Sequence, residues 1–224
     1  MQKINFLANK RRNLAHQQAG FTIIELLIAT LVFSMVLILI AVGVLQFNHA
    51  YYSGITQTDT QNTARSILEE ISQDIQFSGS QITSPIANGG TDPEHGFCIG
   101  SDRYSYRLGW ELVSSGPNVA KHQTLHALVK DSPGICSGMS AQDFTKPLAN
   151  GSQELISQYM RVSKISVTPV SGTTGLYNID VRVVYGDDDL LTNPTASNAT
   201  CKIGSGSQFC AVSELSTVVQ QRIQ

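Results

Sequence analysis

The most regular feature of the chain is an unbroken apolar segment that begins at Phe21 and ends at Phe47, and it contains one acid, Glu25, and no base. Its 27 residues would form a helix about 40 Å long, whereas the hydrocarbon core of a bilayer is about 30 Å thick. The apolar region of a secretory signal peptide is shorter, about 7–15 residues, and ends at a cleavage site of small residues. We therefore expect this segment to stay in the protein and to cross a membrane.

Helical spacing continues beyond the apolar segment, but from about residue 57 it becomes amphipathic. Apolar residues recur every three or four positions, with polar residues between them, in a stripe formed by Ala64, Ile67, Leu68, Ile71 and Ile75. No proline interrupts the pattern, and Gly79 suits a helix C-terminus. These features predict one helix over about residues 21–78, with Gly43 and Gly54 as weak points, and the stripe requires a partner surface.

From Gly79 onward the apolar residues alternate with polar ones, as in half-buried β-strands. The strands predicted by this pattern are Tyr104–Val113, Thr124–Lys130, Tyr159–Val170, Tyr177–Tyr185 and Ala211–Arg222. Turn-forming residues cluster at Ser84–Pro93, Ser114–Asn118, Thr173–Gly175 and Leu191–Ser197. The expected fold class is α+β, with the amphipathic helix half packed on an antiparallel sheet. We expect residues 21–50 in the membrane, residues 51–78 against the head, and residues 79–224 as the head domain.

Charge is distributed unevenly along the chain. Charged residues make up 14% of the chain, against about 25% in a typical soluble domain, and the deficit lies in the apolar segment. Residues 1–20 contain four bases, Lys3, Lys10, Arg11 and Arg12, and no acid. By the positive-inside rule this predicts a cytoplasmic N-terminus and a head on the opposite side of the membrane.

The residues around position 20 carry a family resemblance. A basic leader, Gly20 and the sequence Phe21-Thr22-Ile23-Ile24-Glu25, followed by an apolar helix, resemble the processing motif of type IV pilins and type II secretion pseudopilins. The resemblance implies that residues 1–20 are a leader cut off between Gly20 and Phe21, that Phe21 is N-methylated, and that Glu25 pairs with the N-terminal ammonium of an adjacent subunit. The residues alone also allow a Glu25 that only favours the helix N-terminus. The helix-bending proline of many major pilins is missing.

The layout of the chain points to one branch of this superfamily. Residues 64–79 and 201–224 resemble the PilW family of minor pilins and the related pseudopilin J, whereas the middle of the chain does not. Major pilins are commonly shorter, with a single C-terminal disulfide loop. The resemblance implies a pilin-like fold and a subunit stored in the bacterial inner membrane, with a periplasmic head, which helps prime pilus assembly, reaches the cell surface and is carried at the pilus tip.

The same resemblance implies the partners. These would be other minor and major pilins, a prepilin peptidase/methyltransferase, an inner-membrane assembly platform and the lipid bilayer. Two alternatives stay open: a type II secretion pseudopilin, and a tip adhesin whose head recognises a surface, DNA or an exported protein.

The four cysteines are Cys98, Cys136, Cys201 and Cys210. An outward-facing head matures in an oxidising compartment, so disulfides are expected, and three pairings are possible. We favour Cys201–Cys210, because these residues flank the short Gly/Ser-rich segment Lys202–Phe209, together with Cys98–Cys136.

Residues that could carry chemistry are few. His122 and His126, with Cys136 nearby, would lie about 13 Å apart on a strand, which is too far for one zinc ion. Asp187–Asp189 is typical of a solvated turn and lacks the spaced ligands of a calcium loop. His95, beside Glu94, is expected in a surface loop. No catalytic motif is present, so we expect neither an enzyme nor a cofactor.

Nucleic-acid binding is not favoured by the charge. The chain has 15 bases, and removing the four of the leader leaves 11 against 17 acids, a formal side-chain charge of −6. No basic cluster occurs after Gly79, and phosphate binding needs clustered bases. We expect scattered surface charge at Arg103, Arg107, Lys121 and Lys130, and a patch formed only in three dimensions stays open.

Overall fold

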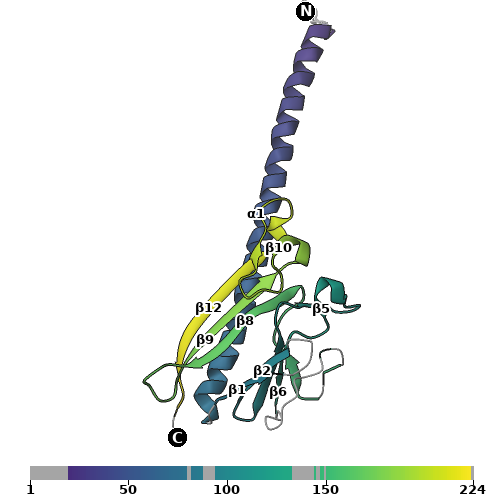
Figure 1. The fold of residues 1–224 in the computed structure, drawn as a ribbon. Coiled ribbons are helices and arrows are strands. Elements are labelled where there is room, and N and C mark those ends of the chain that lie inside the picture. Colours follow the sequence, from purple (N-terminus) through teal and green to yellow (C-terminus); the bar gives the residue numbers. More distant parts are fainter. Residues whose placement is uncertain are drawn as a thin grey trace, which may run out of the picture. The chain divides into compact units, whose positions relative to one another are not determined.

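The structure is a computed structural model that describes residues 20–79, 82–87, 94–132, 144, 147–148 and 150–222. It divides into two compact units, with the boundary between Gln46 and Phe47. The helix α1 runs from Ile23 to Ser78, and β-strands follow it in the sequence (Figure 1). An N-terminal apolar helix followed by antiparallel sheets confirms the predicted α+β, pilin-like fold class.

The first unit consists of the apolar part of α1. Every residue from Ile23 to Gln46 is exposed, and an 18-residue window of the helix has a mean hydropathy of 2.9. The helix is long and apolar enough to cross a membrane. A helix that is apolar all round is typical of a membrane span.

The ends of α1 follow from local sequence. Thr22 precedes the first helical residue, and Gly79, directly after the last one, has a φ of +61°. Glycine adopts this left-handed conformation without strain, which explains why the helix stops there. Gly43 and Gly54 lie inside α1 without interrupting it.

The second unit contains two main sheets. The larger sheet is antiparallel, with strand order β1-β2-β3-β6-β7, and its strands are β1 (Ile82–Ala87), β2 (Glu94–Ile99), β3 (Asp102–Arg107), β6 (Leu128–Asp131) and β7 (Ser152–Glu154). The smaller sheet is antiparallel, with order β12-β9-β8, and consists of β8 (Met160–Pro169), β9 (Leu176–Tyr185) and β12 (Ala211–Gln220). The predicted strands over residues 159–170, 177–185 and 211–222 are thus confirmed.

Short elements complete the head. A parallel pair is formed by β4 (Glu111–Leu112) and β5 (Gln123–Thr124), and an antiparallel pair by β10 (Leu191–Thr192) and β11 (Thr200–Cys201). Three 3-10 turns lie between strands: η1 (Val119–Lys121), η2 (Asp188–Leu190) and η3 (Ser207–Phe209).

Three local predictions were wrong. Tyr104–Val113 is not one strand: the chain turns at Gly109, whose φ is +76° and whose missing Cβ would lie 2.5 Å from Thr195 Cα. Thr124–Lys130 is broken between β5 and β6. Part of the expected turn Ser84–Pro93 belongs to β1, and sequence analysis missed β2 as well.

The predicted stripe of α1 forms part of the core. Ala64, Ile67, Ile71 and Ile75 are at most 1% exposed and pack with apolar residues of both sheets, while Leu68 is partly buried. Thr56 and Thr60 extend the buried face toward the N-terminus, and the Thr60 hydroxyl donates to the Thr56 carbonyl (2.6 Å). Burial of each aliphatic side chain contributes about 1.5–3 kcal/mol. The stripe therefore holds the second half of α1 on the head.

Polar contacts fix the same helix half. Lys130 on β6 lies 2.6 Å from the Glu70 carboxylate and 2.7 Å from that of Asp74, and Tyr104 on β3 donates a hydrogen bond to Asp74. Burial acts to lower the pKa of Lys130, but the two carboxylates outweigh it and raise the pKa.

Replacing Ile71 by Ala should destabilise the head by about 2–5 kcal/mol, because it leaves a cavity at a fully buried position. The measurement is denaturant unfolding of the full chain in detergent micelles, followed by near-ultraviolet circular dichroism. Arg65→Ala, at an exposed position of the same helix, is the control and should change stability by less than about 0.5 kcal/mol. Equal effects of the two substitutions would contradict the packing described.

Candidate processing and assembly site

The start of α1 is a capping box formed by Thr22 and Glu25. The Thr22 backbone N–H and hydroxyl both donate to Glu25 Oε2, each at 2.9 Å. In return the Glu25 N–H donates to Thr22 Oγ1 (3.3 Å). This reciprocal pattern satisfies backbone donors that a helix N-terminus leaves unpaired. Sequence analysis named Glu25 but missed its capping partner, although the Thr-x-x-Glu spacing is visible in the sequence.

The carboxylate has an unused side. Both bonds from Thr22 end on Oε2, and Oε1 accepts no hydrogen bond from the residues that the structure describes. Glu25 is exposed. Helix capping and pairing with an outside cation therefore do not exclude each other, because they can use different oxygens.

The predicted cleavage position lies just outside the helix. Gly20 and Phe21 precede the first helical residue and are exposed, Phe21 by 85%. A protease requires a bond in extended, accessible chain, and the peptide between these residues is free of helical hydrogen bonds. The methylation and the cleavage themselves stay predictions.

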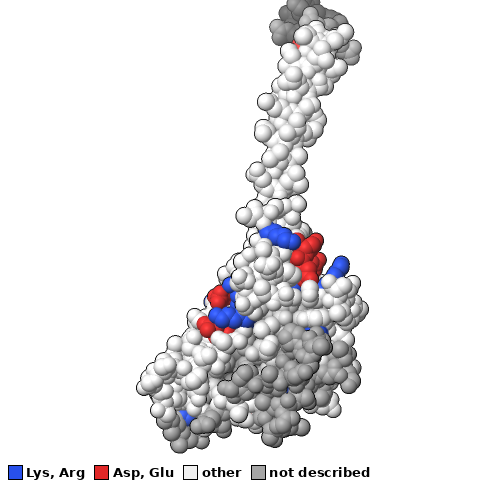
Figure 2. Space-filling model, in the orientation of Figure 1, with Lys and Arg blue, Asp and Glu red and all other residues white. Residues whose placement is uncertain are grey.

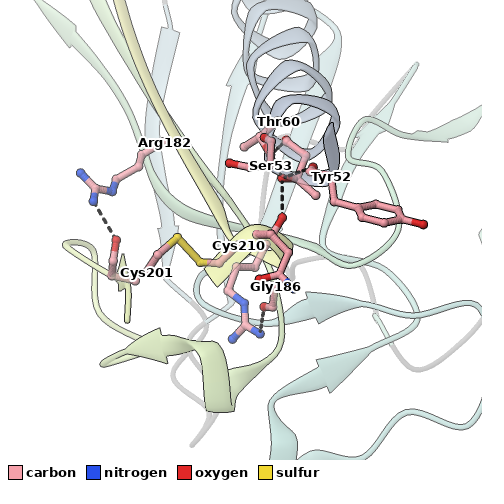
Figure 3. The surroundings of a disulfide bond; sticks show 11 residues. Tyr52, Ser53, Thr60, Arg182, Gly186, Cys201 and Cys210 are labelled. Atoms are coloured by element: carbon pink, nitrogen blue, oxygen red, sulfur yellow. Dashed lines mark hydrogen bonds between the residues drawn. A yellow bond between two sulfur atoms is a disulfide. The ribbon is translucent and has the colours of Figure 1, made fainter. Parts of the chain in front are cut away.

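A disulfide joins Cys201 to Cys210, which is the pairing favoured from the sequence. Figure 3 shows it between Arg182 on one side and α1 on the other. Cys98 is disulfide-bonded and fully buried in β2, whereas its predicted partner, Cys136, lies outside the described residues.

The segment closed by this disulfide is docked on α1. The Thr56 hydroxyl donates to the Gln208 carbonyl (3.1 Å), and the rings of Tyr52 and Phe209 lie 5.5 Å apart. Two residues before Cys201, the Ala199 carbonyl accepts a hydrogen bond from Arg182 Nη2 (2.7 Å). The loop is therefore held against α1 next to Cys210, and Arg182 holds the segment just before Cys201.

Three of the four bases expected as scattered surface charge are not free. Arg103 pairs with Asp131 at 2.5 Å, Lys130 is bound by the acids of α1, and Arg107 is buried, with its guanidinium 3.3 Å from the centre of the Trp110 ring. That prediction was wrong because cross-strand and helix partners were not visible in sequence. Lys121 is exposed, as expected. These pairings remove three bases from any surface that could bind phosphate.

A buried ion cluster was also missed. Arg161 is fully buried; it donates to Asp188 (2.5 Å) and to the carbonyls of Gly109 and Gly186, and lies 3.3 Å from Glu111. Asp188 is thus the counter-ion of a buried arginine, and the expected solvated turn at Asp187–Asp189 was wrong for this residue. Removing one partner of such a group leaves a buried charge, which is strongly destabilising.

The histidines also differ from expectation. His122 has a φ of +49° at the end of η1 and lies 2.6 Å from Asp188, while His126 lies 3.4 Å from Glu154, so the two are not on one strand. His95 lies in β2, half-buried and stacked on Tyr106, and not in a surface loop. Among the described residues, no group of three or more His, Cys, Asp and Glu could hold a metal ion.

A family model matches the N-terminal part of the chain. Residues 15–41 match the model of the prokaryotic N-terminal methylation motif, a stretch that includes Gly20, Phe21 and Glu25. The motif indicates a type IV pilin- or pseudopilin-like protein, and it points to a family of structural subunits. It also fits the membrane anchoring indicated by the apolar helix. No curated protein and no solved structure matches the chain significantly.

Replacing Glu111 by Gln should flatten the pH dependence of stability. Burial and the neighbouring Asp187 carboxylate raise the pKa of Glu111 from 4.5 to about 7, against the opposing effect of Arg161. Between these values the folded state holds a proton that the unfolded state has lost, so stability falls as the pH rises. The wild-type free energy of unfolding should lose about 2–3 kcal/mol more than that of the variant between pH 4.5 and 7.

The measurement is denaturant unfolding in micelles at both pH values, followed by near-ultraviolet circular dichroism. Glu154, whose pKa burial also raises to about 7, is present in both proteins and cancels in the comparison. Identical slopes for wild type and Glu111→Gln would show that Glu111 is ionised in the folded protein at pH 4.5–7.

Proposed function

We propose that this protein is a minor pilin of a type IV pilus, stored in the bacterial inner membrane, which helps prime pilus assembly and is carried at the tip. The observation that carries the proposal is the methylation motif over residues 15–41, with Gly20, Phe21 and Glu25 at the positions that processing and assembly need. Its partners would be other minor and major pilins, the prepilin peptidase/methyltransferase and the inner-membrane assembly platform.

The apolar unit supports an assembling subunit. Its large side chains from Ile23 to Leu45 are 46–81% exposed, and none of the described residues buries them. An apolar surface of this extent is not stable in water. A bilayer covers it in storage, and the apolar helices of neighbouring subunits would cover it in a filament.

The geometry of Glu25 supports pairing between subunits. The Oε2 atom is used by Thr22, and Oε1 faces no donor among the described residues. An ammonium on Phe21 of a neighbouring subunit would supply the missing cation in a membrane, where an unpaired carboxylate is costly.

A type II secretion pseudopilin is the competing function, because it would use the same motif and helix. Deletion of the gene, scored for both surface pili and secreted proteins, separates the two. Loss of pili with normal secretion supports the proposal. Loss of secretion with normal pili assigns the protein to the secretion system.

Processing is the first test. Intact-mass and N-terminal peptide analysis of the protein extracted from membranes of its host should give an N-terminus at Phe21, with the mass of one added methyl group. Gly20→Glu is the control, because its side chain fills the position beside the bond to be cut, and this variant should keep the leader. A wild-type protein that retains residues 1–20 where prepilin peptidase is active would contradict the proposal.

The role of Glu25 is tested by separating charge from capping. Glu25→Ala removes both, Glu25→Gln removes the charge and keeps a hydrogen-bonding group, and Thr22→Val removes the capping hydroxyl alone. We expect Glu25→Ala to reduce co-purification with other pilins by about a hundredfold or more, since an ammonium is left unpaired in a membrane. Glu25→Gln should show a milder defect, and Thr22→Val should assemble almost normally.

All three variants are compared with wild type at matched membrane levels, and surface pili are counted in parallel. If Thr22→Val is as defective as Glu25→Ala, the carboxylate acts as a helix cap. If Glu25→Ala assembles normally, the carboxylate has no assembly role in this subunit.

A further inference from the structure

The disulfide loop exposes a large aliphatic side chain. Ile203, two residues after Cys201, is completely exposed, with a relative exposure of 103%, and Phe209, just before Cys210, is 42% exposed. The disulfide and the bond from Thr56 to the Gln208 carbonyl hold the loop in place. Apolar side chains that a fixed loop exposes to solvent indicate a surface that contacts another molecule when the protein functions.

Aromatic rings connect this loop to the start of the second unit. The ring of Phe47 stacks on that of Tyr51 (6.2 Å between centroids), Tyr51 contacts Tyr52 (5.8 Å), and Tyr52 contacts Phe209 (5.5 Å). All four side chains are 42–69% exposed. The five side chains Phe47, Tyr51, Tyr52, Ile203 and Phe209 are called the aromatic surface below.

The covalent chain keeps this surface close to the apolar unit. Tyr51 follows Gln46, the last residue of that unit, by five residues, which is at most about 18 Å even in extended chain. Tyrosine is enriched where a protein crosses the boundary between lipid and water, because its ring is apolar and its hydroxyl is polar.

We propose that the aromatic surface contacts the membrane. While the subunit is stored in the bilayer, the disulfide loop lies in the headgroup layer. The inference rests on the membrane anchoring of the proposed function. It adds a role for the Cys201–Cys210 loop, which holds Phe209 against Tyr52 and exposes Ile203.

The charges next to the surface determine which lipid it fits. Lys202 is the only base of the segment Lys202–Phe209, and its Nζ donates to the Asp189 carbonyl (2.8 Å). The backbone N–H of Lys202 donates to the Leu190 carbonyl, which places the loop beside η2 (Asp188–Leu190), and Figure 2 shows acidic and basic surface next to one another in this part of the head. With charges of both signs beside it, the aromatic surface has no net attraction for anionic lipids, so the contact is apolar and suits zwitterionic headgroups.

Tryptophan quenching tests the contact directly. The full chain is reconstituted in phosphatidylcholine vesicles whose acyl chains carry bromine close to the headgroups, and the fluorescence of Ile203→Trp is compared with that of wild type. Trp110 is 7% exposed in the head and supplies the background. The added fluorescence of Ile203→Trp should be roughly halved relative to unbrominated vesicles, because residue 203 would lie at the interface.

Val218→Trp is the matched control. Val218 is 57% exposed on β12, eight residues beyond Cys210, and therefore about 26 Å along the strand from the disulfide. Its added fluorescence should be unaffected by bromine. Equal quenching at both positions would overturn the proposal, and so would no quenching at either, which would leave a protein partner as the cover for Ile203.

The second part of the experiment varies the charge of the lipid. Quenching of Ile203→Trp should be the same with and without added phosphatidylglycerol, and quenching that requires the anionic lipid would contradict an apolar contact. Processing at Phe21 and co-purification with pilins are scored separately in cells. A subunit that is processed and assembles but shows no quenching rejects the membrane contact alone, whereas an unprocessed subunit rejects the proposed function.

Discussion

Burial of one face of α1 on the two sheets is the interaction on which the rest of the structure depends. Ala64, Ile67, Ile71 and Ile75 lose nearly all contact with solvent, and the core of the head forms around them. The same continuous helix contains the apolar segment that needs a bilayer or other helices. The helix α1 thus contains both the apolar segment and the face that packs on the head. Without the head, its second half would be an amphipathic helix with no partner for its apolar face.

Several charged side chains of the head are paired inside the fold and are not displayed on its surface. Lys130 and Tyr104 bind the acids of α1, Arg103 is paired across strands, and Arg161 is enclosed by Glu111, Asp188 and two carbonyls. Buried charges are tolerated only with such partners. In the described part of the head, these bases are therefore paired inside the fold and do not form a free basic cluster.

The sequence predicts the fold where one physical signal dominates. The predictions that depend on local pattern were correct. They are the long apolar helix, its buried stripe at three- and four-residue spacing, its end at Gly79 and the three long alternating strands. The turn at Gly109 and the break between β5 and β6 were missed. The first depends on the close approach of Thr195, and at the second the Ala127 N–H donates to the Glu154 carboxylate, so both involve residues distant in the sequence. The capping partner of Glu25 could have been found from the Thr-x-x-Glu spacing. The partners of Arg161 could not, because they come from separate segments.

In-cell photo-crosslinking tests most directly the proposed assembly of the apolar helix with helices of its own kind. A photoreactive amino acid replaces Phe33, whose side chain is 63% exposed in the middle of the apolar unit, and the crosslinked products are identified by mass spectrometry. We expect adducts with proteins that carry the same N-terminal methylation motif. Adducts with lipid alone, in cells that display pili, would contradict the account.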